Sequence, residues 1–420
     1  MKRYFLYIYG CQLNLADAER LAQVLEDLGY VRAAKVAEAN LVVIVACSVR
    51  QKAVDKLFGL AKNLKKLKLK PQTILTGCVA PTDKLKFKNK FDLVIEIKEL
   101  INLPRYLKNK SKSKRQQNYL SLLPLYHSTF QAYIPVMTGC NNFCAYCIVP
   151  YVRGREYSRP AGEVIKEVAK LIKAGYKEIT LVGQNVNSYA YQKYDFPKLL
   201  KTIDQLPGQY WLRFLTSHPK DLSKELIAVM KAGRHLTPYL HLPLQAGDDQ
   251  ILRKMNRGYT VKQYLALIKQ VRQAVPGLAI TTDIIVGFPT ETKKQFAQTK
   301  KVFKQIGYDM AYLSQYSPRP STAAARLVDD VVPTEKKRRW QELNQLLKQS
   351  SLKANRRWLG KETMVLVDQV KADNKLVINF AKTIDLKNVK FTAAKSHLGQ
   401  FVKVKIVKIN DFNLLAEVIR

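Results

Sequence analysis

The sequence predicts an α/β protein with three units: a doubly wound parallel sheet, a central partial (β/α)6 barrel and a small all-β barrel. Two observations predict this architecture. Strand-like apolar runs alternate with helical patterns as far as residue 357, and only short alternating segments follow. The 420 residues also exceed what one ordinary hydrophobic core organises. We expect the units to span residues 1–122, 123–357 and 358–420.

The first unit shows strand patterns at residues 4–9, 41–46, 73–77 and 92–97, with helical patterns that include residues 16–28 and 52–67. Strands that alternate with helices pair in parallel through right-handed crossovers. A polar, basic run at residues 108–118 (KNKSKSKRQQN) follows, and we interpret it as a linker.

The central unit repeats the alternation six times. Strands are expected at residues 132–138, 178–182, 211–216, 239–243, 279–286 and 311–316, with helices between them, for example at 162–173, 220–231 and 261–274. Six repeats are two short of a closed eight-fold barrel, so we expect an open barrel with ligand sites at the carboxyl ends of its strands. A long helix follows Pro333. Strand patterns at 362–367, 375–380, 401–407 and 414–419 then predict a barrel of about five strands, similar to nucleic-acid-binding barrels.

The chain carries a formal net charge of +38, with 71 Lys and Arg against 33 Asp and Glu. So large a surplus is costly in self-repulsion unless an anionic partner offsets it, which favours a polyanion such as nucleic acid. An acidic membrane is the alternative, but no long basic amphipathic helix with an aromatic edge supports it. Neither a bilayer-spanning run nor a signal peptide is visible, so we expect a cytoplasmic protein with no membrane contact.

Three cysteines lie in a loop directly after the first expected strand of the central barrel: Cys140, Cys144 and Cys147, here called the loop cysteines. Their Cys-x3-Cys-x2-Cys spacing predicts an iron–sulfur cluster with one iron left open for another ligand. Zinc is the alternative, but a structural zinc ion would need a fourth ligand nearby, and the downstream candidate His218 lies far along the chain. The spacing therefore favours iron and sulfur.

The other three cysteines each stand at or just after the end of an expected strand in the first unit: Cys11, Cys47 and Cys78, here called the strand-end cysteines. Because the carboxyl ends of parallel strands share one edge of a sheet, we expect these thiols to converge. Buried cysteines that serve as small apolar residues are the alternative. Their equivalent positions at three strand ends favour a second metal site.

Several motifs together resemble the radical S-adenosylmethionine methylthiotransferase family. The segment GCNNFCAYCIVPYVRGREYSRP at residues 139–160 resembles that family's cluster-binding segment, and YGCQLN, CSVRQKA and TGC resemble its amino-terminal domain. SHP, HLPLQAG, TDIIVGFPTET and YSPR follow in the family's order, and HLGQFVKVKI at residues 397–406 resembles its TRAM domain. The resemblance covers essentially the whole chain.

The resemblance implies two 4Fe–4S clusters and S-adenosylmethionine as cofactors. The loop cysteines would hold the cluster that binds S-adenosylmethionine and cleaves it to a 5′-deoxyadenosyl radical. The strand-end cysteines would hold an auxiliary cluster carrying the sulfur to be transferred. One S-adenosylmethionine would methylate that sulfur, and a second would generate the radical. The partners implied are a small reductant protein, such as a flavodoxin or ferredoxin, and a sulfur donor.

Residues after the barrel strands are candidates for the S-adenosylmethionine pocket. In strand order they are Gln184, Asn185, Ser217, His218, Gln245 and Gly287, the last because a glycine backbone can approach a ligand closely. By the same resemblance Tyr146 would lie along the adenine. Arg153 and Arg155 could contact the substrate phosphate or a cofactor carboxylate. An ordinary structural role is the alternative for each, and His241 could be a core histidine.

The motifs CQLN and CSVRQKA resemble the branch that acts on N6-isopentenyladenosine next to the anticodon of tRNA. This predicts methylthiolation at C2 of that base, in a single-stranded loop where an enzyme can splay the base out. The basic charge agrees, because tRNA would be attracted and a basic ribosomal protein repelled. The alternatives are methylthiolation of threonylcarbamoyl-adenosine in tRNA or of a ribosomal protein. From another class, the chain could be a non-catalytic RNA-binding iron–sulfur redox sensor.

Two segments depart from the family pattern. Val45 and Ala46 precede Cys47 where the family usually has Asn-Thr, and residues 371–374 (KADN) replace the usual Gly-Arg-Thr of the TRAM-like unit. Neither departure removes a cysteine.

Overall fold

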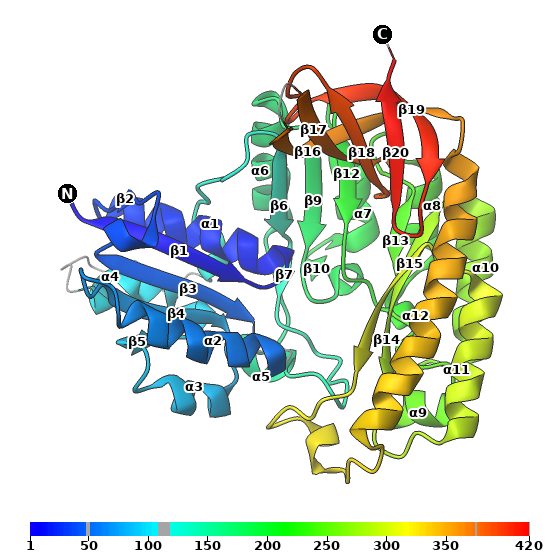
Figure 1. Ribbon diagram of the computed structural model, residues 1–420, viewed down its shortest axis with the longest axis horizontal. Coiled ribbons are helices and arrows are strands. Elements are labelled where there is room, and N and C mark those ends of the chain that lie inside the picture. Colours follow the sequence, from blue (N-terminus) through cyan, green and yellow to red (C-terminus); the bar gives the residue numbers. More distant parts are fainter. Residues whose placement is uncertain (48–50, 108–117, 374–375, 420) are drawn as a thin grey trace.

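The computed structural model in Figure 1 describes residues 1–47, 51–107, 118–373 and 376–419. It has the predicted fold class: an amino-terminal parallel sheet with helices, a central partial barrel and a small closed barrel. In Figure 1 the amino-terminal domain lies to the left of the central strands, and the small barrel covers their upper end. No helix in the described ranges is long and apolar enough to cross a membrane.

The amino-terminal sheet is parallel throughout, in the order β2-β1-β3-β4-β5. Its strands are β1 (Arg3–Tyr9), β2 (Val31–Arg32), β3 (Leu41–Cys47), β4 (Gln72–Cys78) and β5 (Leu93–Val94). Helix α1 (Gln12–Asp27) packs on one face, and α2 (Gln51–Leu64) and α3 (Pro81–Phe87) pack on the other. The short α4 (Leu103–Tyr106) follows. Helices on both faces confirm the doubly wound sheet.

The fourth strand predicted in this domain, residues 92–97, is wrong beyond its first residues. β5 ends at Val94, and Glu96 then caps a 3-10 turn over Ile97–Asn102. The Glu99 side chain accepts a hydrogen bond from the Glu96 backbone at 2.9 Å, which completes the cap. Of the predicted linker, residues 108–117 lie outside the described residues.

Six parallel strands form the central barrel in the predicted chain order, as two three-stranded groups joined by a bridge between Leu212 and Leu236. They are β6 (Gln131–Pro135), β9 (Glu178–Val182), β12 (Trp211–Phe214), β13 (Tyr239–His241), β14 (Ala279–Val286) and β15 (Met310–Gln315). The helices outside them are α6 (Ala161–Lys173), α7 (Phe196–Asp204), α8 (Lys224–Ala232), α10 (Val261–Ala274), α11 (Lys293–Ile306) and α12 (Pro333–Asn355). Strands and helices share one continuous apolar core.

Two predicted elements of this domain have different boundaries. The strand expected at 132–138 breaks after Pro135, and β7 (Met137–Thr138) pairs antiparallel with β8 (Tyr157–Ser158). The helix expected at 220–231 begins later, as α8, because the Ser223 hydroxyl caps its first turn. The remaining short elements are α5 (Val149–Arg153), α9 (Asp249–Lys254), β10 (Ala190–Tyr191) and β11 (Tyr194–Asp195).

The carboxyl-terminal strands close a five-stranded barrel in the order β16-β17-β18-β20-β19. They are β16 (Glu362–Asp373), β17 (Leu376–Thr383), β18 (Asn388–Ala393), β19 (Phe401–Ile409) and β20 (Asn413–Val418). The sequence patterns located four of these strands. β18 was missed, although buried Val389 and Phe391 alternate there with exposed Asn388 and Lys390.

The small barrel docks on the rim where the central strands begin. Arg213 on β12 pairs with Glu178, the first residue of β9, at 2.8 Å, and donates to the carbonyl oxygen of Thr383 at 3.2 Å. Asp309, which directly precedes β15, pairs with Lys387 at 3.2 Å. The small barrel therefore closes the amino end of the central barrel, and the opposite end carries the loop cysteines.

Replacing Arg213 with Met should destabilise the protein by about 3–5 kcal/mol, because it leaves a buried carboxylate without its cation. The Arg213 and Glu178 side chains are 1% and 6% exposed. Chemical denaturation measures the loss, and proteolysis between α12 and β16 should become faster. The matched double variant, Arg213→Met with Glu178→Gln, should recover part of the stability. An unchanged unfolding midpoint in the single variant would show that Arg213 does not hold this interface.

Candidate active site

The strand-end cysteines meet at the carboxyl edge of the amino-terminal sheet. Cys47 and Cys78 end β3 and β4 as partners in register, and Cys11 stands at the start of α1, just after β1. Gly77 allows this close approach: its φ is +104°, and a Cβ there would lie 2.3 Å from the carbonyl oxygen of Ala46. Burial, partly opposed by Arg153 and reinforced by Cys47 and Cys11, raises the pKa of the Cys78 thiol to about 12.

The loop cysteines are gathered by the β7–β8 hairpin, which brings the two ends of their loop together. Gly139 has a φ of +79°, and a Cβ there would lie 2.0 Å from the carbonyl oxygen of Arg155. Within the loop, the Cys147 N–H donates to the Cys144 carbonyl at 2.9 Å. Burial, reinforced by the neighbouring Cys144 and Cys140, raises the pKa of the Cys147 thiol to about 12.

Each set offers three sulfur donors, the ligand type that iron–sulfur clusters require. In the described part of the chain, no three Cys, His, Asp or Glu side chains are gathered closely enough to hold a single metal ion. Because metal ligation needs the thiolate, the raised pKa values of Cys78 and Cys147 mean that a positive metal centre must displace their protons.

Helix α5 joins the two cysteine sets. It begins two residues after Cys147, and Ile148 and Val152 pack against Cys78 in a small buried cluster. In Figure 1, α5 lies at the carboxyl ends of β3 and β4. Both sets therefore lie at one junction between the amino-terminal domain and the central barrel.

Arg153, the last residue of α5, is fully committed to this junction. Its Nε donates to Cys78 Sγ at 2.9 Å, one terminal nitrogen donates to the Tyr119 hydroxyl at 3.0 Å, and the other pairs with Asp17 at 2.6 Å. The Arg153 and Asp17 side chains are 0% exposed. These contacts give Arg153 the structural role that was the alternative interpretation, because each guanidinium nitrogen has a partner within the protein. Arg155 is exposed and lies over the Phe143 ring, 4.6 Å from its centroid, and its predicted contact with a phosphate or carboxylate stays a prediction.

Arg257 is a residue that the sequence reasoning missed. It is 4% exposed, and it donates to Cys144 Sγ at 3.3 Å, to the Tyr259 hydroxyl at 3.1 Å and to the Pro243 carbonyl at 3.2 Å. Among the described residues it has no acidic partner. Because a buried charge is costly unless it is paired, this guanidinium is suited to an anion beside Cys144. No sequence signal marked it, since it follows the short α9 in an irregular turn.

The predicted strand-end pocket contains buried polar atoms that have no hydrogen-bond partner in the described structure. They are Gln184 Oε1, Asn185 Oδ1, Ser217 Oγ, His218 Nε2 and Gln245 Oε1. Such atoms are rare in folded proteins unless a ligand or water satisfies them. Two residues of the same strand ends, Thr216 and Gln245, have φ values of 68° and 69°, a strained conformation typical of functional sites. This cradle fits a polar ligand such as S-adenosylmethionine.

His218 lies inside this cradle as a neutral ring. Its Nδ1 accepts a hydrogen bond from the Lys220 N–H at 3.3 Å, which leaves the proton on Nε2. Burial first, then the charges of Arg257 and Lys220, lowers the pKa of His218 to about 2. Tyr146 is packed beside the loop cysteines and Arg257, and burial raises its pKa well above the usual value.

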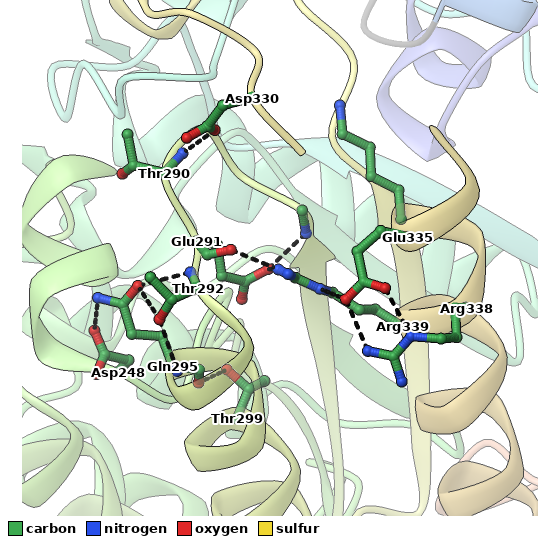
Figure 2. A network of polar contacts seen from close by, with 12 residues as sticks. Asp248, Thr290, Glu291, Thr292, Gln295, Thr299, Asp330, Glu335, Arg338 and Arg339 are labelled. Carbon is green, nitrogen blue, oxygen red and sulfur yellow. Dashed lines mark hydrogen bonds and ion pairs between the residues drawn. The ribbon is translucent and has the colours of Figure 1, made fainter. Parts of the chain in front are cut away.

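Gly287 was predicted to let a ligand approach its backbone, but the side chain beside it is that of a lysine. A Cβ at this residue would lie 2.4 Å from the side chain of Lys336 on α12, so the backbone is approached by that lysine. The Gly287 N–H donates to the Glu291 carboxylate at 2.7 Å, and Glu291 pairs with Arg339 at 2.8 Å. Figure 2 shows how Glu291, Arg339 and Glu335 tie this strand end to α12. A role for Gly287 in cofactor binding stays a prediction.

His241 is satisfied within the barrel, as its alternative interpretation expected. Its ring nitrogens contact the Thr281 hydroxyl at 2.9 Å and the Asp283 carboxylate at 3.1 Å. A cavity of about 700 Å³ lies beside His241 and reaches Phe412 of the small barrel. Its lining includes none of the six cysteines, but it includes Thr216 of the strand ends and Gln12, which directly follows Cys11, so the cavity borders the site described above.

Comparison with known proteins identifies two families within the chain. Residues 134–303 match the Radical SAM superfamily, and residues 3–97 match the uncharacterized protein family UPF0004. The first match contains the loop cysteines, and the second contains the strand-end cysteines.

Curated relatives align over the whole chain. The tRNA-2-methylthio-N(6)-dimethylallyladenosine synthase of Dictyoglomus thermophilum is 40% identical, and the alignment covers 100% of this chain and 99% of the relative. The proteins of the same name from Clostridium botulinum (39% identical, 99% and 96% covered) and Caldicellulosiruptor saccharolyticus (38% identical, 100% and 93% covered) are similar.

Solved structures share the fold at low sequence identity. The radical S-adenosylmethionine methyltransferase TsrM from Kitasatospora setae matches with a TM-score of 0.52 at 13% identity, over 77% of this chain and 75% of that chain. The cobalamin-dependent S-adenosylmethionine radical enzyme OxsB matches with a TM-score of 0.55 at 10% identity, over 83% and 61%.

Replacing Arg257 with Met should stabilise the metal-free protein and weaken its hold on iron. Replacing a buried charge that has no acidic partner with an apolar side chain removes the cost of desolvating that charge. The Pro243 carbonyl keeps a hydrogen bond from Tyr259 at 3.1 Å. A metal-bound Cys144 thiolate would, however, lose its neighbouring cation.

Thermal unfolding of the metal-free protein and iron retention against a chelator measure these two effects. Arg257→Lys is the matched control, and we expect it to retain iron better than Arg257→Met. A Met variant that is less stable without metal and keeps iron as well as the wild type would contradict this role.

Proposed function

The chain belongs to the radical S-adenosylmethionine methylthiotransferases and aligns throughout with tRNA-2-methylthio-N(6)-dimethylallyladenosine synthases; on this premise we propose that it methylthiolates C2 of N6-isopentenyladenosine (dimethylallyladenosine) next to the anticodon of tRNA. The observation that carries the proposal is the meeting of two three-cysteine sets, from two domains, at one junction. A protein that needed one structural metal would require only one of them.

In this proposal the loop cysteines hold one 4Fe–4S cluster and the strand-end cysteines hold a second. When bound, the clusters and S-adenosylmethionine supply the radical chemistry and the sulfur. The chain itself positions these groups. Arg153 and Arg257 each donate an N–H to one cysteine sulfur, Cys78 and Cys144 respectively, and hydrogen bonds to cluster sulfurs tune reduction potentials.

The strand-end cradle is the proposed S-adenosylmethionine pocket. Its unpartnered polar atoms on Gln184, Asn185, Ser217 and Gln245 support this assignment, because a ligand with amino, carboxylate and ribose groups would satisfy them. Tyr146 would lie along the adenine. Burial of these groups also excludes water, which protects a reactive radical from side reactions.

Solvent access supports the proposed partners. Cys11 is exposed whereas Cys78 is buried, so the strand-end site is open on the Cys11 side, where a sulfur donor could reach it. A small reductant protein, such as a flavodoxin or ferredoxin, would supply electrons. The site of action would be the cytoplasm, where the substrate tRNA is found.

The second candidate substrate is threonylcarbamoyl-adenosine, but the relatives that align over the whole chain are named for dimethylallyladenosine. A non-catalytic redox sensor would have no need for the strained, ligand-fitting cradle at the barrel strand ends. The methylthiotransferase proposal accounts for both features.

Anaerobically reconstituted protein should hold two 4Fe–4S clusters. Replacing Cys140, Cys144 and Cys147 with Ala should halve the iron content and abolish cleavage of S-adenosylmethionine. Replacing Cys11, Cys47 and Cys78 with Ala should also halve the iron but preserve reductive cleavage. Iron analysis and product chromatography measure both properties. Wild-type protein with the iron of a single cluster, or with zinc, would contradict the two-cluster proposal.

The enzyme should discriminate between modified tRNAs. An isopentenyl group is apolar, and each buried methylene is worth about 0.8 kcal/mol, so its five carbons favour this base strongly over unmodified adenosine. A threonylcarbamoyl group carries a carboxylate and would need a cationic partner instead. Offering tRNAs with each modification under identical reducing conditions tests the choice. Methylthiolation of threonylcarbamoyl-adenosine alone would overturn the substrate and leave the reaction class standing.

A further inference from the structure

Positive charge is concentrated on one side of the amino-terminal domain. Residues 51–90 contain eleven lysines and two acidic residues. Helices α2 and α3 pack together on one face of the sheet, where the Phe58 and Phe87 rings lie 4.6 Å apart. On the opposite face, the exposed charges near the end of α1 are acidic, Glu26 and Asp27. The lysine-rich side of this domain is therefore the side of α2 and α3.

We use the name lysine face for six of the exposed lysines at the end of α2 and in the turns that follow α2 and α3: Lys62, Lys65, Lys66, Lys70, Lys88 and Lys90. None of the six forms an ion pair with another described residue. Nearby, Lys84 and Lys86 do pair, with Glu96 and Asp83. The six unpaired ammonium groups repel one another, so an anionic partner would be attracted to them.

The lysine face contains a groove. A hollow of about 590 Å³ lies between the end of α2 and the start of β4, and Lys65, Lys70 and Lys90 line it. The one acidic residue in its lining, Asp92, accepts hydrogen bonds from the backbone and hydroxyl of Thr73 at 2.7 Å each. Three lysines around one hollow form a site suited to phosphate groups.

The groove and the cysteines lie at opposite ends of one strand. β4 is seven residues long, about 20 Å at ~3.3 Å per residue, with the groove at its start and Cys78 at its end. Helix α3 begins three residues after Cys78, and its Asp83 pairs at 2.5 Å with Arg319, which follows β15 at the carboxyl rim of the central barrel. The small barrel, by contrast, is docked on the opposite rim.

We propose that the lysine face binds the sugar–phosphate backbone of the RNA substrate, with the stem of the anticodon arm along α2 and α3 and its loop at the cysteines. This inference rests on the proposed function and adds the surface that holds the substrate. Charge complementarity carries it, because phosphates dominate the affinity of proteins for nucleic acids. Leu69 and Leu85, 54% and 76% exposed among the lysines, supply apolar contacts for sugars.

The test compares two triple variants of the iron-loaded full-length protein that remove equal charge. The groove variant is Lys65→Gln, Lys70→Gln and Lys90→Gln. The control is Lys262→Gln, Lys269→Gln and Lys301→Gln, three exposed lysines on α10 and α11. The probe is full-length tRNA bearing N6-isopentenyladenosine, titrated at several salt concentrations. Circular dichroism and iron content, expected to be unchanged, show that both variants are folded.

We expect the affinity of the groove variant for this tRNA at low salt to be lower by a factor of about ten or more. The slope of log affinity against log salt should fall by about 2–3, since each lost phosphate contact removes roughly 0.7–0.9. KM for tRNA should rise while kcat at saturating tRNA stays within about twofold. The control should change affinity by less than about threefold.

Equal losses in both variants would overturn the proposal, because only net charge would then matter. Unchanged binding by the groove variant would also overturn it. The proposal would be overturned as well if the groove variant lost binding to phosphatidylserine vesicles but kept its affinity for tRNA, since the lysine face would then bind membranes. If wild-type protein methylthiolates tRNA and the groove variant binds normally, only this inference fails. If wild-type protein neither binds nor modifies tRNA, the proposed function itself fails.

Discussion

The ion pair between Arg153 and Asp17 is the contact on which the arrangement of this protein depends. It is completely buried, it joins α5 of the central barrel to α1 of the amino-terminal domain, and the same guanidinium holds Cys78. Burying two charges is expensive, so such a pair contributes little net stability, but breaking it would leave a buried carboxylate unpaired. Its value here is positional, because it links the domain that carries one cysteine set to the domain that carries the other.

Two parallel sheets, one in each domain, direct their carboxyl ends toward this contact. The loops at the carboxyl edge of a parallel sheet lie outside its core, so each sheet can supply three cysteines there without disturbing its own packing. The small barrel closes the amino end of the central barrel through Arg213 and Lys387. The carboxyl end therefore stays available for a substrate, and α3, which precedes Lys88 and Lys90 of the lysine face, borders it through the contact of Asp83 with Arg319.

The sequence predicted what depends on local pattern and strand topology. The alternation of strands and helices predicted parallel sheets. Parallel sheets in turn predicted that the strand-end cysteines converge, as Cys47 and Cys78 do in register. Contacts between distant segments left no pattern to detect. Arg153 and Asp17 are 136 residues apart, and Arg257 lies 113 residues from Cys144, so neither role could be inferred from spacing. Gly287 was chosen for backbone freedom, but only the folded chain shows that Lys336 occupies the space beside it.

The central claim is that the two cysteine sets form one site and not two separate ones. Low-temperature electron paramagnetic resonance of the reduced, fully loaded protein tests it most directly. Two reduced clusters at one junction should couple magnetically and give a broadened or split signal. That signal should be absent from the variants that lack either the loop or the strand-end cysteines. A wild-type spectrum equal to the simple sum of the two variant spectra would contradict the shared site.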